Sequence, residues 1–309
     1  MAVGTGASGI AGLAMETVAG TYVAPTKYFP FDSESFKYQQ DTTWRRPIRA
    51  TPNVIGAIPG NSHIEGDMTM DALVDIVPYF LYAARTNIVK AGAAPYTYTC
   101  TASPVAVPAK TMSLTIVRNG ITFGYTGVVV GGFKFTIDGM ALKFSVTLMG
   151  RDETTQSLPT ATWPTSIPFG AGQYKMEIPT TSTVLDTDSF EFSQESNATP
   201  QYRLKDTGRG AQFFTFGEDA TTLSVQRDFE ARTDYDAYKA LTSQSITLTC
   251  TQSANAIISI NLNTAIKDSY EVALGGQGDL IRASVSYIAV ANAAGTGYTI
   301  IITNTENIV

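Results

Sequence analysis

Two segments far apart in the chain alternate hydrophobic and polar residues in almost the same way. They are MALKFSVTLMG (140–150) and DLIRASVSYIA (279–289). Successive side chains of a β-strand point to opposite faces, so each segment predicts a strand with one buried apolar face and one hydrated polar face. The polar faces carry Lys143, Ser145 and Thr147 in the first strand and Arg282, Ser284 and Ser286 in the second.

The residues around the first of these strands predict an antiparallel meander. Runs rich in Val, Ile, Thr, Tyr and Phe between 96 and 150 are separated by Asn119-Gly120, Gly131-Gly132 and Asp138-Gly139. Asn-Gly and Asp-Gly are strong hairpin signals because these residues tolerate positive φ. The segment GGQGD (275–279) predicts a further hairpin turn, since no helix pattern follows it as a phosphate-binding loop would require.

Two other segments have helical spacing. In DALVDIVPYFLYAART (71–86) apolar residues recur every three or four positions, with Asp71 as the predicted N-cap and Pro78 as a residue that kinks or shortens the helix. RTDYDAYKALTSQ (232–244) predicts a second helix that starts near Asp234.

The order of these elements repeats along the chain. DSESFKY (32–38) returns as DTDSFEF (186–192), and SLTI (113–116) returns as SITL (245–248). The offsets are 154 and 132 residues, against 139 for the alternating pair described first, and loops absorb such differences in length cheaply. Chance similarity between amphipathic strands is the alternative, but the shared order favours an internal duplication. The sequence therefore predicts a mainly β protein with two tandem duplicated β-sandwich or half-barrel domains, each with one flanking α-helix.

The predicted domain boundaries follow breaks in this pattern. Residues 1–30 are rich in Gly, Ala and Thr with weak periodicity, and predict an extended N-terminal arm. Residues 31–153 form the first predicted domain. Three prolines mark residues 154–174 as a linker, and residues 175–309 form the second domain.

After the first strand of each domain comes a long stretch with little periodicity, about 40–60 and 196–217. Long loops inside compact domains are usually functional. Their basic and aromatic side chains predict contacts with an acidic neighbouring surface, and the alternative is a solvated loop with scattered charges. These side chains are Trp44, Arg45, Arg46 and Arg49 in the first loop, and Arg203, Lys205 and Arg209 in the second.

Composition narrows the classes of protein that fit. The chain has 309 residues and a net charge of −6, with 44% hydrophobic and only 16% charged residues, which suits a β-rich protein whose surface is partly covered by neighbours. Residues 1–154 hold 12 basic and 11 acidic side chains, and residues 155–309 hold 9 and 16. The absence of a basic run disfavours a sequence-specific nucleic-acid binder.

Targeting signals and disulfides are not expected. No stretch of about 20 apolar residues predicts a membrane span, and the N-terminus has no basic region before its apolar residues, as a signal peptide would. We therefore expect folding in the cytoplasm, with Cys100 and Cys250 as reduced, half-buried thiols rather than a disulfide.

The sequence offers little to support catalysis. His63 is the single histidine, so relays and metal sites that need several histidines in one chain are excluded. The carboxylates Asp228, Glu230, Asp234 and Asp236 could serve glycoside hydrolysis, but acidic residues in the first turn of a helix are ordinary partners of its dipole. We predict no catalytic residue, no cofactor site and no metal site, and no enzyme.

One segment resembles a known family. GLAMETVAGTYVAPTKYFPFDSESF (12–36) looks like the opening of major tail tube proteins from long-tailed, siphophage-type bacteriophages, in which an ETxxGT-like segment and a proline precede the first strand. Here that segment comprises Glu16, Thr17, Gly20 and Thr21, followed by Pro25. The hairpin block 111–150 and the closing GTGYTIIITNTENIV (295–309) are also similar to that family.

The resemblance implies a structural subunit with tail-tube-type domains. In that family, units join edge strands into a continuous inner barrel, and the rings stack into a hollow conduit for DNA. Many members have one tube domain and form hexameric rings, so a duplicated chain suggests three chains and six similar units per ring. The N-terminal arm and the long loops would contact adjacent rings, which assigns inter-ring contacts to Glu16, Thr17 and Tyr22 besides the loop residues named above.

The same resemblance implies the partners and the location. The polar strand faces at Lys143 and Arg282 become candidates for the lumen. The expected partners are copies of the same chain, the tape measure, tail terminator and distal tail proteins, and phage DNA that passes without specific binding; no membrane is expected. The protein would reside in the virion tail after assembly in the cytoplasm of the host bacterium.

The alternative is a receptor-binding or decoration module of a virion with two Ig-like domains. Such a module should tolerate removal of residues 1–30, whereas a tube subunit should lose ring stacking.

Overall fold

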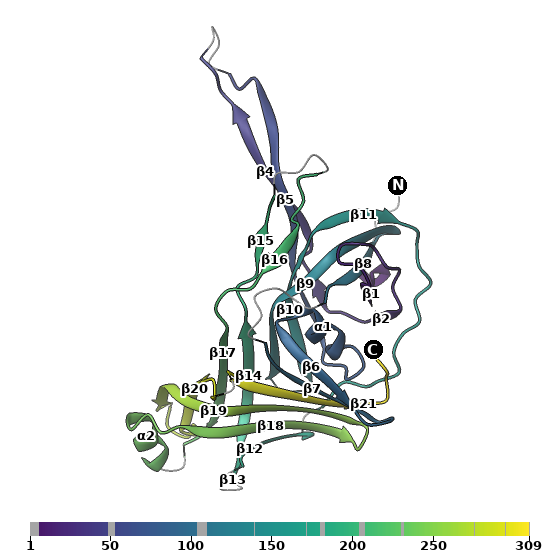
Figure 1. Ribbon diagram of the computed structural model, residues 1–309. Helices are drawn as coiled ribbons and strands as arrows, with labels where there is room; N and C mark the ends of the chain where they lie inside the picture. The colour runs from purple at the N-terminus through teal and green to yellow at the C-terminus, as the bar shows by residue number, and fades with distance from the viewer. Residues whose placement is uncertain are drawn as a thin grey trace.

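A computed structural model describes residues 6–48, 53–103, 110–138, 140–170, 172–179, 183–203, 208–229, 232–274, 276–293 and 295–308. Most of these residues are in antiparallel strands, with two short α-helices (Figure 1). The mainly β class and the sandwich-like arrangement of sheets predicted from the sequence are confirmed.

Among the residues described, the first half of the chain contains a short 3₁₀ turn (Gly6–Ser8), eleven strands and helix α1. They are β1 (Ile10–Met15), β2 (Lys27–Phe29), β3 (Ser33–Glu34), β4 (Lys37–Arg45), β5 (Gly56–Asp71), α1 (Val77–Ala83), β6 (Thr86–Ala91), β7 (Tyr96–Ala102), β8 (Met112–Arg118), β9 (Ile121–Asp138), β10 (Leu142–Gly150) and β11 (Asp152–Gln156).

The described part of the second half contains ten strands and helix α2. They are β12 (Tyr174–Ile178), β13 (Thr183–Leu185), β14 (Thr187–Glu195), β15 (Thr199–Gln201), β16 (Phe213–Thr215), β17 (Ala220–Asp228), α2 (Arg232–Lys239), β18 (Gln244–Ser253), β19 (Ala256–Ala273), β20 (Arg282–Ala289) and β21 (Tyr298–Asn304).

One sheet crosses both halves of the molecule. Its central strands run in the order β5, β10, β9, β14, β17, β20 and β19, all antiparallel. The two halves meet where β14 pairs with the C-terminal part of β9, with Phe192 opposite Phe135. They meet again where β21 pairs with β7. The connection between the halves is therefore made by strand pairing as well as by the irregular chain between β11 and β12.

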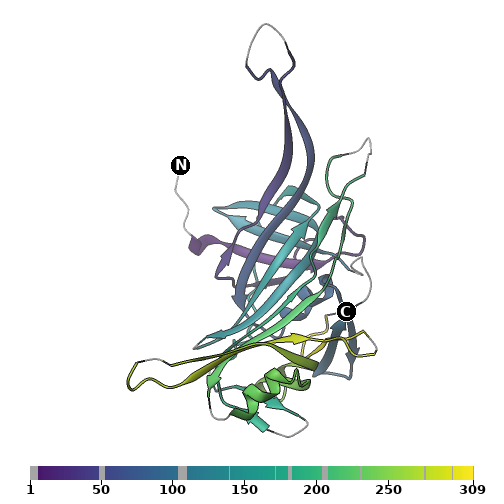
Figure 2. The ribbon, with the colours of Figure 1, turned by 90° about the vertical axis from the view of Figure 1, so that its left-hand side faces the viewer.

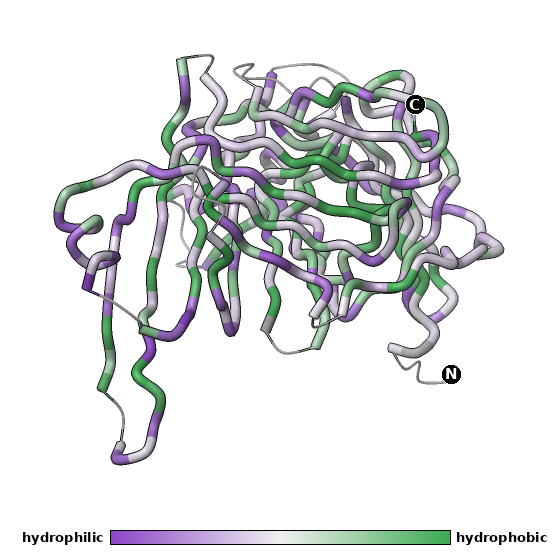
Figure 3. The backbone as a smooth tube through the Cα atoms, turned by 90° about the horizontal axis from the view of Figure 1, so that it is seen from below, coloured by the Kyte–Doolittle hydropathy of each residue, from purple (hydrophilic) through white to green (hydrophobic). Residues whose placement is uncertain are grey.

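The other strands form the layer that closes the sandwich. In the first half, β2, β1, β8, the N-terminal part of β9 and β11 lie side by side, and helix α1 is buried beneath them. Aromatic rings from both halves share the core: the ring centroid of Phe133 lies 6.2 Å from that of Phe192 and 6.3 Å from that of Tyr298. Figure 3 shows hydrophobic stretches concentrated in the central strands. Burial of large aromatic side chains supplies much of the stabilisation.

The two halves have the same strand order. In the first half, neighbouring strands of the sheet follow the order β4, β5, β10, β9. In the second half, the corresponding order is β14, β17, β20, β19. Even the irregularities coincide. A bulge interrupts the pairing of β9 with β10 between Thr147 and Leu148, and another interrupts β19 with β20 at the matching place, between Lys267 and Ser269.

These registers test the alignment of the repeated segments. They align Leu114 with Ile246 and Val146 with Val285, as the sequence offsets predict. The match of DSESFKY with DTDSFEF is wrong by two residues. According to the strand pairing, the residue of the first half that is equivalent to Phe190 is Glu34 and not Phe36. A shift of two keeps every side chain on the same face of a strand, so hydropathy cannot detect it.

Residues 10–29 differ from the predicted extended arm. Strand β1 lies between β8 and β2, and Ala11 and Leu13 are fully buried. Small residues let this strand approach its neighbours closely: a Cβ at Gly12 would lie 2.8 Å from the Cβ of Pro25. Four consecutive residues of this strand are buried, so hydropathy does not alternate along it and the pattern gives no strand signal.

The first helix begins later than predicted. Helix α1 starts at Val77 with Pro78 in its first turn, where a missing N–H costs nothing. Asp71 is the last residue of β5 and not an N-cap; its carboxylate is paired with Lys143 instead. The second helix starts at Arg232, close to the predicted position.

Two predicted breaks in the strands are also corrected. The stretch 40–60 is not an irregular loop: β4 and β5 continue into it as a projecting ribbon (Figure 1). Gly131-Gly132 does not separate strands, because β9 runs through it and Gly131 is the bulged residue. Asn119 and Gly120 form the expected hairpin turn, with φ of 50° and 77°.

Helix α2 covers the second half only at its surface. Tyr235 and Tyr238 contact the ring of Tyr270 on β19, and Asp234 is ion-paired with Arg227 and Lys267. Burial and the nearby Arg227 guanidinium lower the pKa of Lys267 to about 8.

The two cysteines are free and buried, as single thiols. Burial raises the pKa of both, to about 12 for Cys250. Within the described part of the chain, neither helix has the length and apolarity needed to cross a membrane.

Candidate functional surfaces

The strands of the central sheet share one polar face. Directly opposed partners place the side chains of Lys143 and Asp71, of Ser145 and Lys134, and of Ser284 and Glu271 on the same side of the sheet. We call this side the polar face, and it comprises Asp67, Thr69, Asp71, Lys134, Thr136, Lys143, Ser145, Thr147, Glu191, Ser193, Ser224, Gln226, Ser269, Glu271, Arg282, Ser284 and Ser286. The six strand residues predicted to line a lumen all lie on it.

The cations of the polar face are neutralised by carboxylates of the same chain. Lys143 Nζ lies 2.8 Å from Asp32 Oδ2 and 2.7 Å from Asp71 Oδ1. These two hydrogen-bonded carboxylates raise the pKa of Lys143. Arg282 Nε lies 3.0 Å from Asp188 Oδ2, and Lys134 Nζ lies 2.9 Å from Glu191 Oε1. Lys143 of β10 is thus paired with Asp71 of β5, and Arg282 of β20 with Asp188 of β14.

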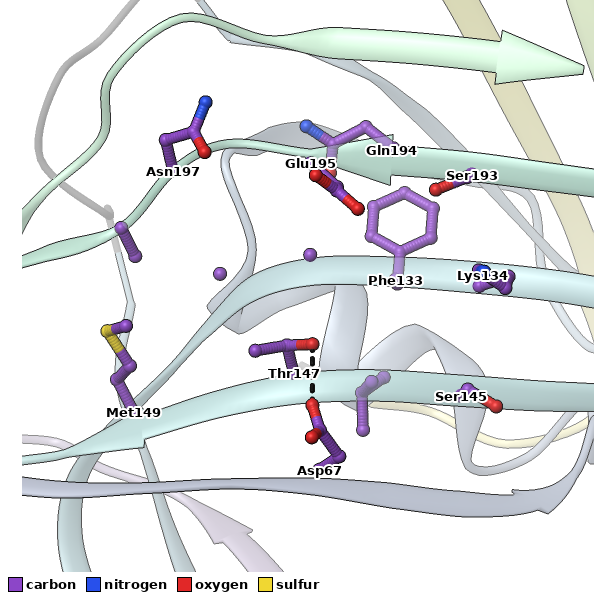
Figure 4. A pocket seen from close by; sticks show the side chains of 14 residues that line it. Asp67, Phe133, Lys134, Ser145, Thr147, Met149, Ser193, Gln194, Glu195 and Asn197 are labelled. Atoms are coloured by element: carbon purple, nitrogen blue, oxygen red, sulfur yellow. Dashed lines mark hydrogen bonds between the residues drawn. The ribbon is translucent and has the colours of Figure 1, made fainter.

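The polar face is hollowed where β9 carries Gly131 and Gly132. Without side chains on β9 at this point, a depression of about 560 Å³ opens between β10 and β14 (Figure 4). Its walls carry both apolar and polar side chains, with Phe133 and Met149 among the apolar ones. Thr147 Oγ1 donates a hydrogen bond of 2.8 Å to Asp67 Oδ1, and Glu195 and Asn197 lie on the opposite side.

The ribbon of β4 and β5 projects far from the body of the molecule (Figure 2). Trp44 is 61% exposed, and Arg45 and Arg46 at the end of β4 are also exposed. Arg49 lies outside the described residues. Neither face of the ribbon is buried against this chain near Trp44, so its side chains are available for contact.

The second predicted loop packs beside this ribbon. It contains the hairpin β15–β16, and a backbone bridge joins Gly210 to Ser62 of β5. Tyr202 is hydrogen-bonded to His63 Nδ1 at 2.9 Å. Arg203 lies over the ring of Phe213 at 5.4 Å and Arg209 is exposed, whereas Lys205 lies outside the described residues. The structure thus brings together two loops that the sequence treats separately.

The three candidates near the N-terminus differ in exposure. Glu16 is only 7% exposed, and its carboxylate accepts hydrogen bonds from Ser113 Oγ at 2.9 Å and from the N–H of Gly127 at 2.8 Å. These contacts within the chain account for Glu16 without a neighbouring molecule. Tyr22 donates to or accepts from Thr115 Oγ1 at 2.8 Å, and Thr17 is exposed.

One contact at the edge of the sheet has no signal in the sequence pattern. Arg118 Nη2 donates to the carbonyl of Phe36 at 2.9 Å, and its guanidinium is paired with Glu34 at 2.5 Å. Because Ser35 bonds to β5, the backbone of Phe36 points away from β5 toward the open edge. Burial opposes ionisation of Glu34, but hydrogen bonds and charge from Arg118 hold the pKa of Glu34 below its usual value.

The acidic residues near α2 have structural partners. Asp234 is paired with Arg227 and Lys267, Asp236 with Arg232, and Glu230 lies outside the described residues. Over the ranges that the structure describes, no three His, Cys, Asp or Glu side chains are grouped to hold a metal ion.

Comparison with known proteins agrees with these features. The family model described as phage tail tube protein matches residues 6–289. Among curated proteins, none matches the chain. Tail tube proteins are structural, which favours a tube subunit over the receptor-binding or decoration module considered as the alternative. The match over nearly the whole length shows that this chain belongs to the phage tail tube protein family.

Proposed function

We propose that the chain forms closed rings of three copies, which stack into the hollow tail tube through which the phage genome is delivered. Each copy would contribute two similar units, about residues 31–153 and 175–309 with 154–174 between them. The matching strand orders and bulges support an internal duplication, and they extend the first unit back to β1. Six similar units per ring follow from three chains.

The main support for the proposal is the strand pairing that connects the two halves, which we call the internal joint. Strand β9 of the first half pairs with β14 of the second. In the second half, β19 is the equivalent of β9. In the first half, the edge formed by β3 and β4 is the equivalent of β14. In the described chain the segment 266–273 of β19 pairs only with β20, and β3 and β4 pair only with β5. Repeating the internal joint between copies would satisfy both edges.

The register of this contact follows from the internal joint. It places Glu271 of one copy opposite Lys37 of the next, and Val272 opposite Phe36. An exposed strand edge is a template for pairing, and head-to-tail contacts close a ring without free edges. The Arg118 side chain covers the Phe36 carbonyl in the single chain and would have to leave it. Side-chain capping of this kind protects an edge from premature pairing.

The polar face would then line the lumen. Its Ser and Thr hydroxyls and paired charges present few free cations to phosphate, and each free cation would strengthen DNA binding and slow transit. The tape measure, tail terminator and distal tail proteins would be the other partners, in the virion tail assembled in the host cytoplasm.

Disulfide trapping tests the ring contact. The variant Lys37→Cys with Glu271→Cys should form intermolecular disulfides, because opposed strand residues have Cβ atoms about 4.5–5.5 Å apart. Oxidised samples should end at a species of three chains, with threefold symmetry in electron micrographs. Tyr38→Cys with Glu271→Cys is the control, since the side chain at 38 points to the other face. A chain that stays monomeric at all concentrations, or control and test pairs that cross-link equally, would refute the contact.

A further inference from the structure

A small apolar cluster shows how the end of the polar face is covered in the first half. Val129 of β9 is fully buried and pairs with Met149 of β10, just beyond the bulge. Above them lie Phe214 and Phe216, which are 1% and 6% exposed, with Ala198. These residues belong to the β15–β16 hairpin and its flanks, which come from the second half. One unit therefore lays its hairpin over the apolar end of the unit beside it.

The equivalent place in the second half is uncovered. Ile266 pairs with Ile288 just beyond the matching bulge, as Val129 pairs with Met149. Ile288 is 42% exposed and Val290 is 39% exposed, and both line a surface depression with Ile266 and with Leu241, which is 64% exposed. We call these four residues the apolar end. Grouped exposed aliphatic side chains of this kind mark contact surfaces.

The ribbon has the same register as the hairpin that covers the first half. In β15–β16, Thr199 pairs with Thr215 and Pro200 with Phe214. In β4–β5, after a one-residue irregularity, Thr43 pairs with Ile58 and Trp44 with Ala57. The Pro200 and Phe214 side of the hairpin corresponds to the side of the ribbon that carries Trp44, Ala57 and Pro59.

We propose that the Trp44 side of the β4–β5 ribbon seats on the apolar end of a neighbouring copy in the same ring. The occupant is a second copy because this chain already uses the equivalent contact between its own halves. When seated in this way, the ribbon would exclude water from Ile288 and Val290, just as Phe214 excludes water from Val129. Trp side chains are frequent anchors of such contacts. The inference rests on the head-to-tail ring proposed above and adds a second contact to it.

Fluorescence can follow Trp44 alone. The chain has two tryptophans, so Trp163→Phe leaves Trp44 as the single reporter. When rings form, the Trp44 emission should move to shorter wavelength and its quenching by acrylamide should fall severalfold. Ile288→Lys should abolish both changes and raise the protein concentration needed for half assembly at least about tenfold. Ile121→Lys is the matched control: Ile121 is 57% exposed at a hairpin far from the apolar end in sequence, and its replacement should change neither quantity.

The outcomes separate the two proposals. Rings in which Trp44 stays fully quenchable, or in which Ile288→Lys leaves Trp44 shielded, would overturn the seating of the ribbon while leaving the strand joint intact. Failure of the Trp163→Phe and unmodified chains to form rings would refute the proposed function itself. The measurement is made on single rings, separated from stacked tubes by sedimentation, so that contacts between rings do not shield Trp44.

Discussion

At the scale of single residues, buried charges in this protein are paired by neighbours from distant strands. Glu16 is held by a side chain of β8 and the backbone of β9, and the buried Lys267 is paired with Asp234. Removing one partner of a buried pair leaves an uncompensated charge, which costs more than the pair itself contributes.

The Glu34–Arg118 pair makes stability depend on pH. The pKa of Glu34 is lower in the folded chain than its usual value, so its contribution is present above about pH 4.5 and is lost as the pH falls through the folded pKa. We expect Glu34→Gln to lower the free energy of unfolding by about 2 kcal/mol at neutral pH. The difference from the unmodified chain should shrink as the pH is lowered below about 4.5. Urea denaturation at a series of pH values measures this, and a difference that does not change with pH would contradict it.

At the scale of elements, the hairpins differ in what they contact. The β15–β16 hairpin buries Phe214 within the chain, whereas the ribbon buries nothing near Trp44. A segment whose contacts lie outside the chain can be shortened without loss of folding stability.

Shortening the ribbon tip should separate ring formation from stacking. Replacing residues 46–54 by Asn-Gly joins Arg45 to Ile55, whose N–H donates to the Arg45 carbonyl at 3.1 Å. Asn-Gly suits a two-residue turn in a hairpin. Because Trp44 and the strand edges remain, we expect an unchanged melting temperature and normal rings, but no long tubes in electron micrographs. Tubes of normal length would show that the tip makes no essential contact between rings.

The individual strands show which parts of the fold a hydropathy pattern predicts and which it does not. Strands β10 and β20 were predicted correctly because each has one buried and one hydrated face. The ribbon was missed because both of its faces are exposed, and β1 because four consecutive residues are buried. Alternation is visible only where burial is one-sided.

At the scale of the whole molecule, pairing of charges on the polar face should keep DNA from binding. The cations of Lys143, Lys134 and Arg282 each have a carboxylate partner. Counterion release makes DNA affinity rise with each cation left free.

Removing the partners should therefore create affinity for DNA. In the variant Asp32→Asn, Asp71→Asn and Asp188→Asn, which leaves Lys143 and Arg282 without their carboxylate partners, we expect binding of double-stranded DNA that weakens steeply with salt, whereas the unmodified rings bind none at about 0.15 M salt. The control Glu153→Gln, Glu218→Gln and Asp236→Asn changes the net charge equally but alters no residue of the polar face. Equal DNA binding by the two variants in a filter or gel assay would show that net charge, not the polar face, decides.

The sequence alone determined the β class, the two alternating strands with their polar faces, both helices and the order of elements that the halves share. Those features depend on local periodicity and turn chemistry, which neighbouring residues encode. Only the tertiary structure decided that β14 pairs with β9, that the predicted loops lie together, and that the alignment of the first strands shifts by two residues. Pairing between distant strands depends on which edges are left open and on which apolar side chains can be covered, and no local pattern records either.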